Sequence, residues 1–361
     1  MSQLTKSLRN LITKPVRTLN HSGNLFVNPL LKRRMLFLPS KIDVEPTTKC
    51  NLNCIYCQVP GWERAKKKDL TIQEFKEILE RFPLLKSVKL QGMGESFLNR
   101  DIFDMIKYCN QKDIVVHINT NGTVLDEEKI KKLFASPPTC ISFSLNTPNR
   151  KTFLTLQGKD LFNKVIENIR LTVKEKRNTH ASTTVRLWCV LNTYNLKEIP
   201  DLVRLAKKLN VEELSIQTRL GSYGKDELKN KNDEIRVNIF EKQTGEILKE
   251  AESLARELGI NLTIYTSDYY SKDKPCSLIK STVYISVEGE VVPCCVIGDP
   301  RIISMGSIAG EKSFLNIWNS KKYKQLRDAI NKNELPSFCK TCYHLAEEMS
   351  QEYLKEQEEY T

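Results

Sequence analysis

A run of 18 or more apolar residues is absent from this chain of 361 residues, and its absence argues against a membrane-spanning helix. The chain also opens without the apolar core of a secretion signal. With no sign of export and an odd count of 11 cysteines, a framework of disulfide bonds is not expected. We therefore predict a cytoplasmic protein with reduced thiols.

Acidic residues are absent from the first 40 positions, whereas the last 15 are strongly acidic, and the net charge is +12. This asymmetry is typical of contact with nucleic acid, a lipid surface or an acidic protein, although a solvated basic face gives the same pattern. The basic stretch lacks interleaved aromatic residues, which disfavours nucleic acid. Its basic residues are Lys6, Arg9, Lys14, Arg17, Lys32, Arg33 and Arg34.

Leucine and isoleucine recur at helical spacing before Pro15, which predicts a short amphipathic helix over residues 4–12. Such a helix either lies on a membrane or caps the core. The cap is favoured because the stretch is short and proline steps follow it.

Short apolar strands alternate with amphipathic helices from residue 40 onward. This order predicts an α/β fold with a parallel sheet, here a partial (β/α)6 barrel of the TIM type, with the chemistry at the carboxyl ends of the strands. The strands are predicted at 41–45, 87–91, 115–119, 140–145, 184–190 and 213–217. The helices are predicted at 71–82, 100–111, 126–135, 162–176 and 196–209, with a long helix at 233–258 and a strand near 261–266.

Three cysteines stand close together after the first predicted strand, at Cys50, Cys54 and Cys57. Structural zinc prefers four protein ligands and Cys-x2-Cys pairs, so the Cys-x3-Cys-x2-Cys spacing fits zinc poorly. Three thiolates fill three of the four ligand positions of a cubic iron–sulfur cluster. The fourth iron is then open to a substrate or cofactor.

The triplet resembles the signature of the radical S-adenosylmethionine (SAM) superfamily, including the aromatic Tyr56 before the third cysteine. The resemblance implies that the triplet holds a [4Fe-4S] cluster whose open iron binds SAM. It also implies reductive cleavage of SAM to a 5′-deoxyadenosyl radical, which abstracts a hydrogen atom from a substrate carbon. An acidic flavodoxin or ferredoxin would then supply the electrons.

Polar turns follow the next predicted strands, and the family resemblance makes them candidate SAM contacts. In the family, a Gly-Gly-Glu-Pro-like segment binds the amino group of SAM; here Gly92, Gly94 and Glu95 match it, with Met93 and Ser96 as departures. Small hydroxyls and amides at later strand ends are suited to ribose or carboxylate contacts. The candidate cofactor-binding residues are Tyr56, Gly92, Gly94, Glu95, Asn121, Ser144, Arg186 and Asn192.

Four later cysteines, Cys276, Cys294, Cys339 and Cys342, leave zinc and a second cluster equally favoured on spacing alone. The segment resembles the SPASM or twitch domain of radical SAM enzymes, which implies one fully liganded auxiliary [4Fe-4S] cluster. Cys295 has no partner in this pattern. It is either a spare thiol, an alternative ligand or a hydrogen donor to a substrate radical. Three more cysteines, Cys109, Cys140 and Cys189, are predicted to lie in the core.

The predicted organisation is a basic extension over 1–39, a radical SAM barrel over 40–220, a linker and helix over 221–270, a SPASM or twitch domain over 271–345 and an acidic tail over 346–361. The auxiliary cluster favours an oxidoreductase that oxidises or epimerises a sugar-like or cyclitol-like small molecule. The alternatives are crosslinking or epimerisation of a ribosomally made peptide and, third, modification of RNA.

Overall fold

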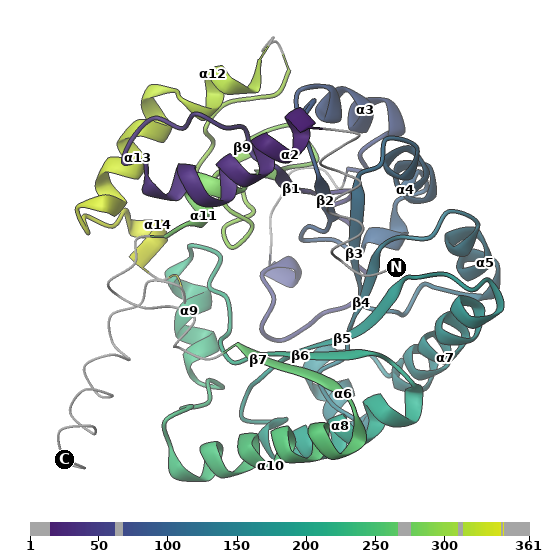
Figure 1. Ribbon diagram of the computed structural model, residues 1–361. Helices are drawn as coiled ribbons and strands as arrows, with labels where there is room; N and C mark the ends of the chain where they lie inside the picture. The colour runs from purple at the N-terminus through teal and green to yellow at the C-terminus, as the bar shows by residue number, and fades with distance from the viewer. Residues whose placement is uncertain (1–14, 62–67, 266–275, 310–312, 341, 343–361) are drawn as a thin grey trace.

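Nine strands form one sheet in the computed structural model, which describes residues 15–61, 68–265, 276–309, 313–340 and 342. The strand order is β7-β6-β5-β4-β3-β2-β1-β8-β9, and every neighbouring pair is parallel except β8 with β9. The sheet curves into an arc with helices on its outer side (Figure 1). The strands are β1 (Lys41–Val44), β2 (Ser87–Leu90), β3 (Val115–Thr120), β4 (Cys140–Ser144), β5 (Thr184–Val190), β6 (Glu213–Gln217), β7 (Asn261–Tyr265), β8 (Tyr284–Ile285) and β9 (Val291–Val292).

The helices follow the strands in alternation, as a parallel sheet requires. None of those in the described ranges is long and apolar enough to cross a membrane. Those before and around the barrel are α2 (Pro15–Ser22), α3 (Ile72–Glu80), α4 (Ile102–Gln111), α5 (Glu127–Ala135), α6 (Arg150–Gln157), α7 (Phe162–Asn178), α8 (Ile199–Leu209), α9 (Asp226–Asp233) and α10 (Lys242–Leu258). Those of the C-terminal region are α11 (Leu278–Ser281), α12 (Phe314–Trp318), α13 (Lys321–Asn331) and α14 (Ser337–Lys340).

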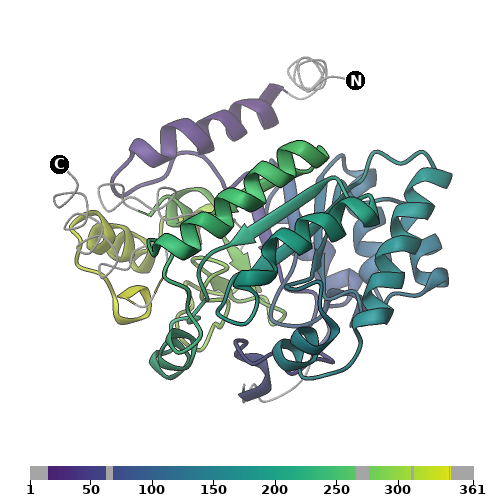
Figure 2. The ribbon, with the colours of Figure 1, turned by 90° about the horizontal axis from the view of Figure 1, so that it is seen from below.

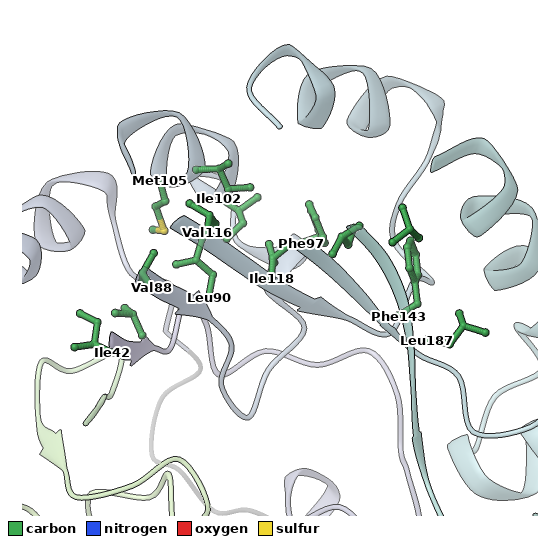
Figure 3. Close-up of a cluster of buried hydrophobic side chains, with 14 of the residues drawn as sticks. Ile42, Val88, Leu90, Phe97, Ile102, Met105, Val116, Ile118, Phe143 and Leu187 are labelled. Carbon is green, nitrogen blue, oxygen red and sulfur yellow. The ribbon is translucent and has the colours of Figure 1, made fainter. Parts of the chain in front are cut away.

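Alternation along the strands separates an apolar outer layer from a polar interior. Because successive side chains of a strand point to opposite faces, Val88 and Leu90 on β2 pack outward with Val116 and Ile118 on β3 (Figure 3). All four are fully buried. The intervening positions carry polar side chains such as Lys89, so the concave side of the sheet is suited to a polar ligand.

The partial barrel predicted from the sequence is confirmed, with all six strands and five helices within a few residues of their predicted bounds. The strand predicted near 261–266 is β7, which pairs with β6 and extends the sheet. The long helix predicted at 233–258 is confirmed in part: α10 ends at Leu258 as predicted but begins at Lys242, and α9 is a separate helix that ends at Asp233. Between them Val237 is buried and the carbonyl of Ile235 accepts a hydrogen bond from the Thr193 amide, which holds the chain against the barrel.

The predicted helix at 4–12 and the acidic tail lie outside the described residues. The three cysteines predicted as core residues, Cys109, Cys140 and Cys189, are buried as expected.

The C-terminal region is attached to the barrel through β8, which pairs in parallel with β1. Its centre is the buried guanidinium of Arg327, which lies 4.4 Å from the ring centroid of Trp318 and 4.7 Å from that of Tyr323. This guanidinium donates hydrogen bonds to the carbonyls of Ile279, Trp318 and Arg33. One side chain therefore joins α11, α12 and the segment that precedes the barrel.

The turn after β2 packs directly on the chain that leads to Cys50. A Cβ atom at Gly94 would lie 2.3 Å from the carbonyl oxygen of Thr47 and 2.5 Å from that of Lys49. The next residue confirms the close approach, since the Glu95 amide donates to the Lys49 carbonyl at 2.7 Å. Glycine is therefore required at position 94 for packing between two backbone segments.

Replacing Gly94 with alanine tests this packing. Gly94→Ala is expected to lower the free energy of unfolding by about 1–3 kcal/mol, because two backbone carbonyls must move to make room. Gly245→Ala in α10 is the matched control, since no atom lies within 4 Å of its added Cβ, and it should leave stability unchanged or raise it by up to about 1 kcal/mol. Thermal unfolding followed by circular dichroism measures both, and equal effects would contradict the packing role.

Candidate functional site

A cavity of about 480 Å³ opens at the carboxyl ends of the barrel strands and is lined by residues from the turns after β1, β2, β3 and β4. The cysteine triplet lies on its wall together with Tyr56. Of the other predicted cofactor contacts, the lining includes Gly92, Gly94, Glu95, Asn121 and Ser144. The structure thus brings most of the predicted site residues to one cavity, where a parallel sheet places its chemistry.

The loop that carries the triplet is held by α6, a helix that the sequence did not predict. The amides of Asn53 and Ile55 donate hydrogen bonds to the carbonyls of Gln157 and Leu156, the last two residues of α6. Gly158 then ends the helix in the left-handed conformation, with φ of 73°, close against Asn53. A side chain at Gly158 would strain the backbone, because φ is positive there, and it would collide with Asn53 in the triplet loop.

Tyr56 is fixed by Asn146, which lies in the turn after β4. The Asn146 amide group donates to the Tyr56 hydroxyl, and its oxygen accepts from the Val190 amide at 2.8 Å. Burial raises the pKa of Tyr56 well above its usual value, so the phenol stays neutral. Tyr56 and Asn146 therefore connect the triplet loop to β5.

Glu95 is a buried carboxylate that braces the cavity wall. It accepts hydrogen bonds from the Asn121 amide at 2.6 Å, the Thr120 hydroxyl at 2.7 Å and the Phe97 amide at 3.2 Å. Burial raises the pKa of this carboxyl against the effect of those three donors. Glu95 thus ties the turn after β2 to the end of β3.

Gly92 leaves room for a second buried carboxylate, Glu45. A Cβ at position 92 would lie 2.3 Å from the Glu45 Cγ. The Glu45 carboxylate accepts from the Met93 amide at 3.2 Å and the Val287 amide at 3.1 Å. The space that glycine leaves at 92 is therefore filled by protein, which sequence reasoning did not foresee.

The three thiols of the triplet are partly buried and lie near one another. Burial and then the neighbouring thiols raise the pKa of Cys54 to about 12, and burial raises that of Cys57 to about 11 and also that of Cys50. Thiolates form in such a place only when a cationic centre binds them. The donor set therefore fits a cluster with one position left for another ligand.

The four later cysteines come together in the C-terminal region. Burial, followed by the nearby thiols of Cys295, Cys342 and Cys276, raises the pKa of Cys294. Burial, then Cys342 and Cys276, raises the pKa of Cys339 to about 12. The set fits a closed cluster, which takes each thiolate at a different iron.

Cys295, next to Cys294 in the chain, lines the cavity. Its thiol is hydrogen-bonded to the carboxylate of Asp43 on β1, which also accepts from the Gln91 amide at 3.2 Å. Gln91 in turn accepts from Asn119 at 2.9 Å. These hydrogen bonds form a chain of polar groups along the inside of β1, β2 and β3. Burial raises the pKa of the Asp43 carboxyl within this chain.

These interior residues were not singled out from the sequence. Lys89, Gln91 and Asn119 line the cavity with Gln217. Trp188 and Tyr265 line it too, their tilted rings having centroids 5.4 Å apart. The signal that could have identified them is the alternation of polar and apolar residues along each predicted strand.

Two predicted contacts, Arg186 and Asn192, are not among the residues that line the cavity. The Arg186 guanidinium is paired with Glu213 on the neighbouring strand β6. Asn192 is fully buried, and its side chain donates to the Val190 carbonyl at 3.1 Å. Both side chains are occupied within the protein.

Two family descriptions match this chain. The radical SAM superfamily matches residues 44–206, and an iron–sulfur cluster-binding domain of the SPASM type matches residues 276–343. These two domains imply a SAM-binding [4Fe-4S] cluster and auxiliary iron–sulfur chemistry. The radical SAM match begins at the end of β1 and includes the triplet. The SPASM match includes all four later cysteines.

Two relatives are similar over most of their length. A tungsten-containing aldehyde ferredoxin oxidoreductase cofactor-modifying protein of Pyrococcus furiosus is 28% identical over 318 residues, covering 83% of this chain and 86% of the relative. An AdoMet-dependent heme synthase of Methanosarcina barkeri is 26% identical over 326 residues, covering 84% and 88%.

Solved structures share the fold at lower identity. SuiB of Streptococcus suis, bound to its precursor peptide SuiA, superposes with a TM-score of 0.65 at 16% identity, covering 96% of this chain and 76% of SuiB. BtrN, in complex with AdoMet and 2-DOIA, superposes with a TM-score of 0.51 at 16% identity, covering 85% of this chain and 93% of BtrN. With the cysteine sets, the cavity and both family matches in agreement, the chain belongs to the radical SAM superfamily and carries a C-terminal SPASM domain.

Proposed function

We propose that the protein is an oxidoreductase that removes two electrons from a carbinol carbon of a small, hydroxyl-rich molecule such as a sugar or cyclitol. In this proposal Cys50, Cys54 and Cys57 hold the SAM-binding cluster. Cys276, Cys294, Cys339 and Cys342 hold the auxiliary cluster. Radical SAM chemistry follows from the family, and the substrate and the outcome are what the proposal adds.

The observation that carries the proposal is the arrangement of two adjacent cysteines. Cys294 lies with the other thiols of the auxiliary set, whereas Cys295 lines the cavity that contains the triplet. A single peptide bond therefore connects the auxiliary set to the cavity wall. An electron that leaves a substrate in the cavity has a short path to the auxiliary site.

The size and lining of the cavity support a small polar substrate. About 480 Å³ must hold both SAM and the reacting part of the substrate, which leaves room for one small molecule or one side chain. The amides of Gln91, Asn119 and Gln217 and the ammonium of Lys89 line it. Amide groups both donate and accept hydrogen bonds, as hydroxyl groups require.

When bound and reduced by one electron, the SAM site supplies a 5′-deoxyadenosyl radical that takes a hydrogen atom from the carbinol carbon. The carbinol would then lose its hydroxyl proton to solvent and one electron to the auxiliary cluster that the four later cysteines would hold, which would leave a ketone. The products are 5′-deoxyadenosine, methionine and the ketone. A flavodoxin or ferredoxin is the proposed source of the first electron and the acceptor of the last.

A second outcome, epimerisation, is favoured by Cys295. Its S–H bond would break to return a hydrogen atom to the opposite face of the carbon radical. The resulting sulfur radical would regain one electron from the electron donor and one proton from water. Oxidation and epimerisation thus differ in whether the Cys295 thiol takes part.

The relatives bear on the substrate class. Two that cover most of the chain are named for modifying a cofactor and for heme synthesis, which supports a small organic substrate and makes a cofactor an alternative to a sugar. The peptide alternative is supported by the fold that this chain shares with SuiB, which was solved with its precursor peptide bound. The RNA alternative has only the net charge of +12.

Iron content tests the assignment of the two cysteine sets. After anaerobic reconstitution the wild-type chain is expected to hold about eight irons, from two clusters of four. Cys294→Ala should hold about four irons and still cleave SAM to 5′-deoxyadenosine when reduced, whereas Cys54→Ala should lose SAM cleavage. A wild-type chain with about four irons, or with zinc in its C-terminal region, would refute the auxiliary cluster.

Turnover of deuterated cyclitols and sugars separates the two outcomes. If the reaction is an oxidation, Cys295→Ala should retain its iron and still transfer deuterium into 5′-deoxyadenosine. It should form ketone at a rate within about threefold of the wild type, a change of less than about 1 kcal/mol in activation free energy. Cys109→Ala, which removes a buried sulfur in α4, is the matched control. Loss of product in Cys295→Ala alone, with deuterium from D₂O in the wild-type product, would establish epimerisation instead.

A further inference from the structure

The segment that precedes the barrel has its polar residues inside and its apolar residues outside. Asn20, Asn24 and Asn28 follow one another at intervals of four residues and are 5%, 0% and 0% exposed. The segment comprises α2, a π-helical turn (Gly23–Val27) and a 3-10 turn (Asn28–Leu30). In a helix that caps a soluble core, the apolar side faces inward, and here the order is reversed.

The buried asparagines fix this orientation. Asn20 donates to the Leu38 carbonyl at 3.1 Å and accepts from the Leu38 amide at 3.0 Å. Asn28 donates to the Phe37 carbonyl at 2.8 Å and to the Lys280 carbonyl at 3.3 Å. Rotation of the segment to bury its apolar side would leave these amides unpaired, which is costly. The apolar side is therefore held outward.

The outward side forms an apolar ridge, which we define as Val16, Leu19, Phe26, Leu30 and Leu36. These side chains are 62%, 65%, 71%, 81% and 63% exposed. Elsewhere in the described residues, large hydrophobic side chains are exposed singly on separate elements, as at Leu154 and Leu315. The apolar ridge instead gathers five exposed large hydrophobic side chains on one segment of the chain, and such a concentration marks an interaction surface.

The surroundings of the apolar ridge are positively charged. His21 in α2 lies near Lys41 and Lys86, and burial followed by those two charges lowers the pKa of His21 to about 4. The first 40 residues contain no acidic residue. An anionic partner is therefore favoured by charge.

A second basic surface lies at the same end of the barrel. A hollow of about 250 Å³ is lined by the carboxyl ends of α7 and α8, including Lys174, Arg177 and Lys208. The chain runs from the end of α7 into β5 and from the end of α8 into β6, so this hollow lies at the amino ends of those two strands. Two separate basic features thus share one end of the molecule.

The apolar ridge lies at the end of the barrel opposite the cavity. His21 hydrogen-bonds Ser40, which precedes β1, and Arg17 donates to the carbonyls of Lys112 and Asp113, which precede β3. The cavity lies at the other ends of those strands. Figure 2 shows α2 on the outside of the fold, at the top, with α9 at the bottom. A partner on the ridge would leave the cavity open.

We propose that the apolar ridge is a docking surface for an anionic lipid bilayer. Protruding aliphatic and aromatic side chains beside basic residues are suited to the boundary between acyl chains and anionic headgroups. The ridge stands on a helical segment that the asparagines hold in place, so its side chains enter the lipid without rearrangement. The cavity then faces the aqueous phase, where a soluble substrate and an electron donor reach it.

Sedimentation with vesicles tests the proposal on the reconstituted full chain. Vesicles of phosphatidylglycerol and phosphatidylcholine at 3:7, about a physiological anionic fraction, should co-sediment the protein, and pure phosphatidylcholine should bind at least about tenfold less. Phe26→Ser/Leu30→Ser should reduce binding to the anionic vesicles by about tenfold or more, because two large apolar groups are lost. Leu154→Ser/Leu315→Ser is the matched control and should bind like the wild type.

Each remaining outcome overturns the proposal. Equal binding by the two double variants would exclude the ridge. Absence of vesicle binding together with a dimer in analytical ultracentrifugation, reduced to a monomer by Phe26→Ser/Leu30→Ser, would assign the ridge to a second copy of the chain. Absence of vesicle binding by a monomer would also refute it. Cleavage of SAM by the reduced protein should be unchanged in both double variants, which checks that they are folded.

Discussion

The buried carboxylate of Glu45 connects the two halves of the site. It stands at the end of β1 and accepts hydrogen bonds from the amide of Met93, in the turn after β2, and of Val287, just after β8. Without it both amides would be buried and unpaired, at a cost of about 1–3 kcal/mol each. Together with the pairing of β1 and β8, this side chain holds the C-terminal region, which contains Cys295, against the barrel.

Local patterns in the sequence predicted what depends on local physics. Alternation and helical periodicity gave six strands and five helices close to their observed bounds, and the spacing of the triplet indicated its chemistry. The short α6 was missed, because eight residues with few apolar positions give a weak periodic signal. Yet the end of α6 holds the triplet loop.

Contacts between distant residues explain the rest of what sequence reasoning missed. Gly92 and Gly94 were predicted as cofactor contacts, and their missing side chains make room for Glu45 and for the backbone at 47–49. Arg186 faces Glu213 because β5 and β6 are neighbours, which no spacing within β5 reveals. Asp43 and Cys295 are 252 positions apart, and only β1–β8 pairing brings them together.

The pairing of β1 with β8 also has a consequence for how the chain folds. The first strand of the barrel is completed on one side by β2 and on the other by a strand that begins at Tyr284, so during synthesis its outer edge stays open until most of the chain has left the ribosome. Unpaired strand edges are prone to aggregate. A chain truncated before residue 284 would therefore keep every predicted barrel strand and still leave one edge of β1 unpaired and open to aggregation. Such a fragment is a poor substitute for the whole protein in crystallisation or expression.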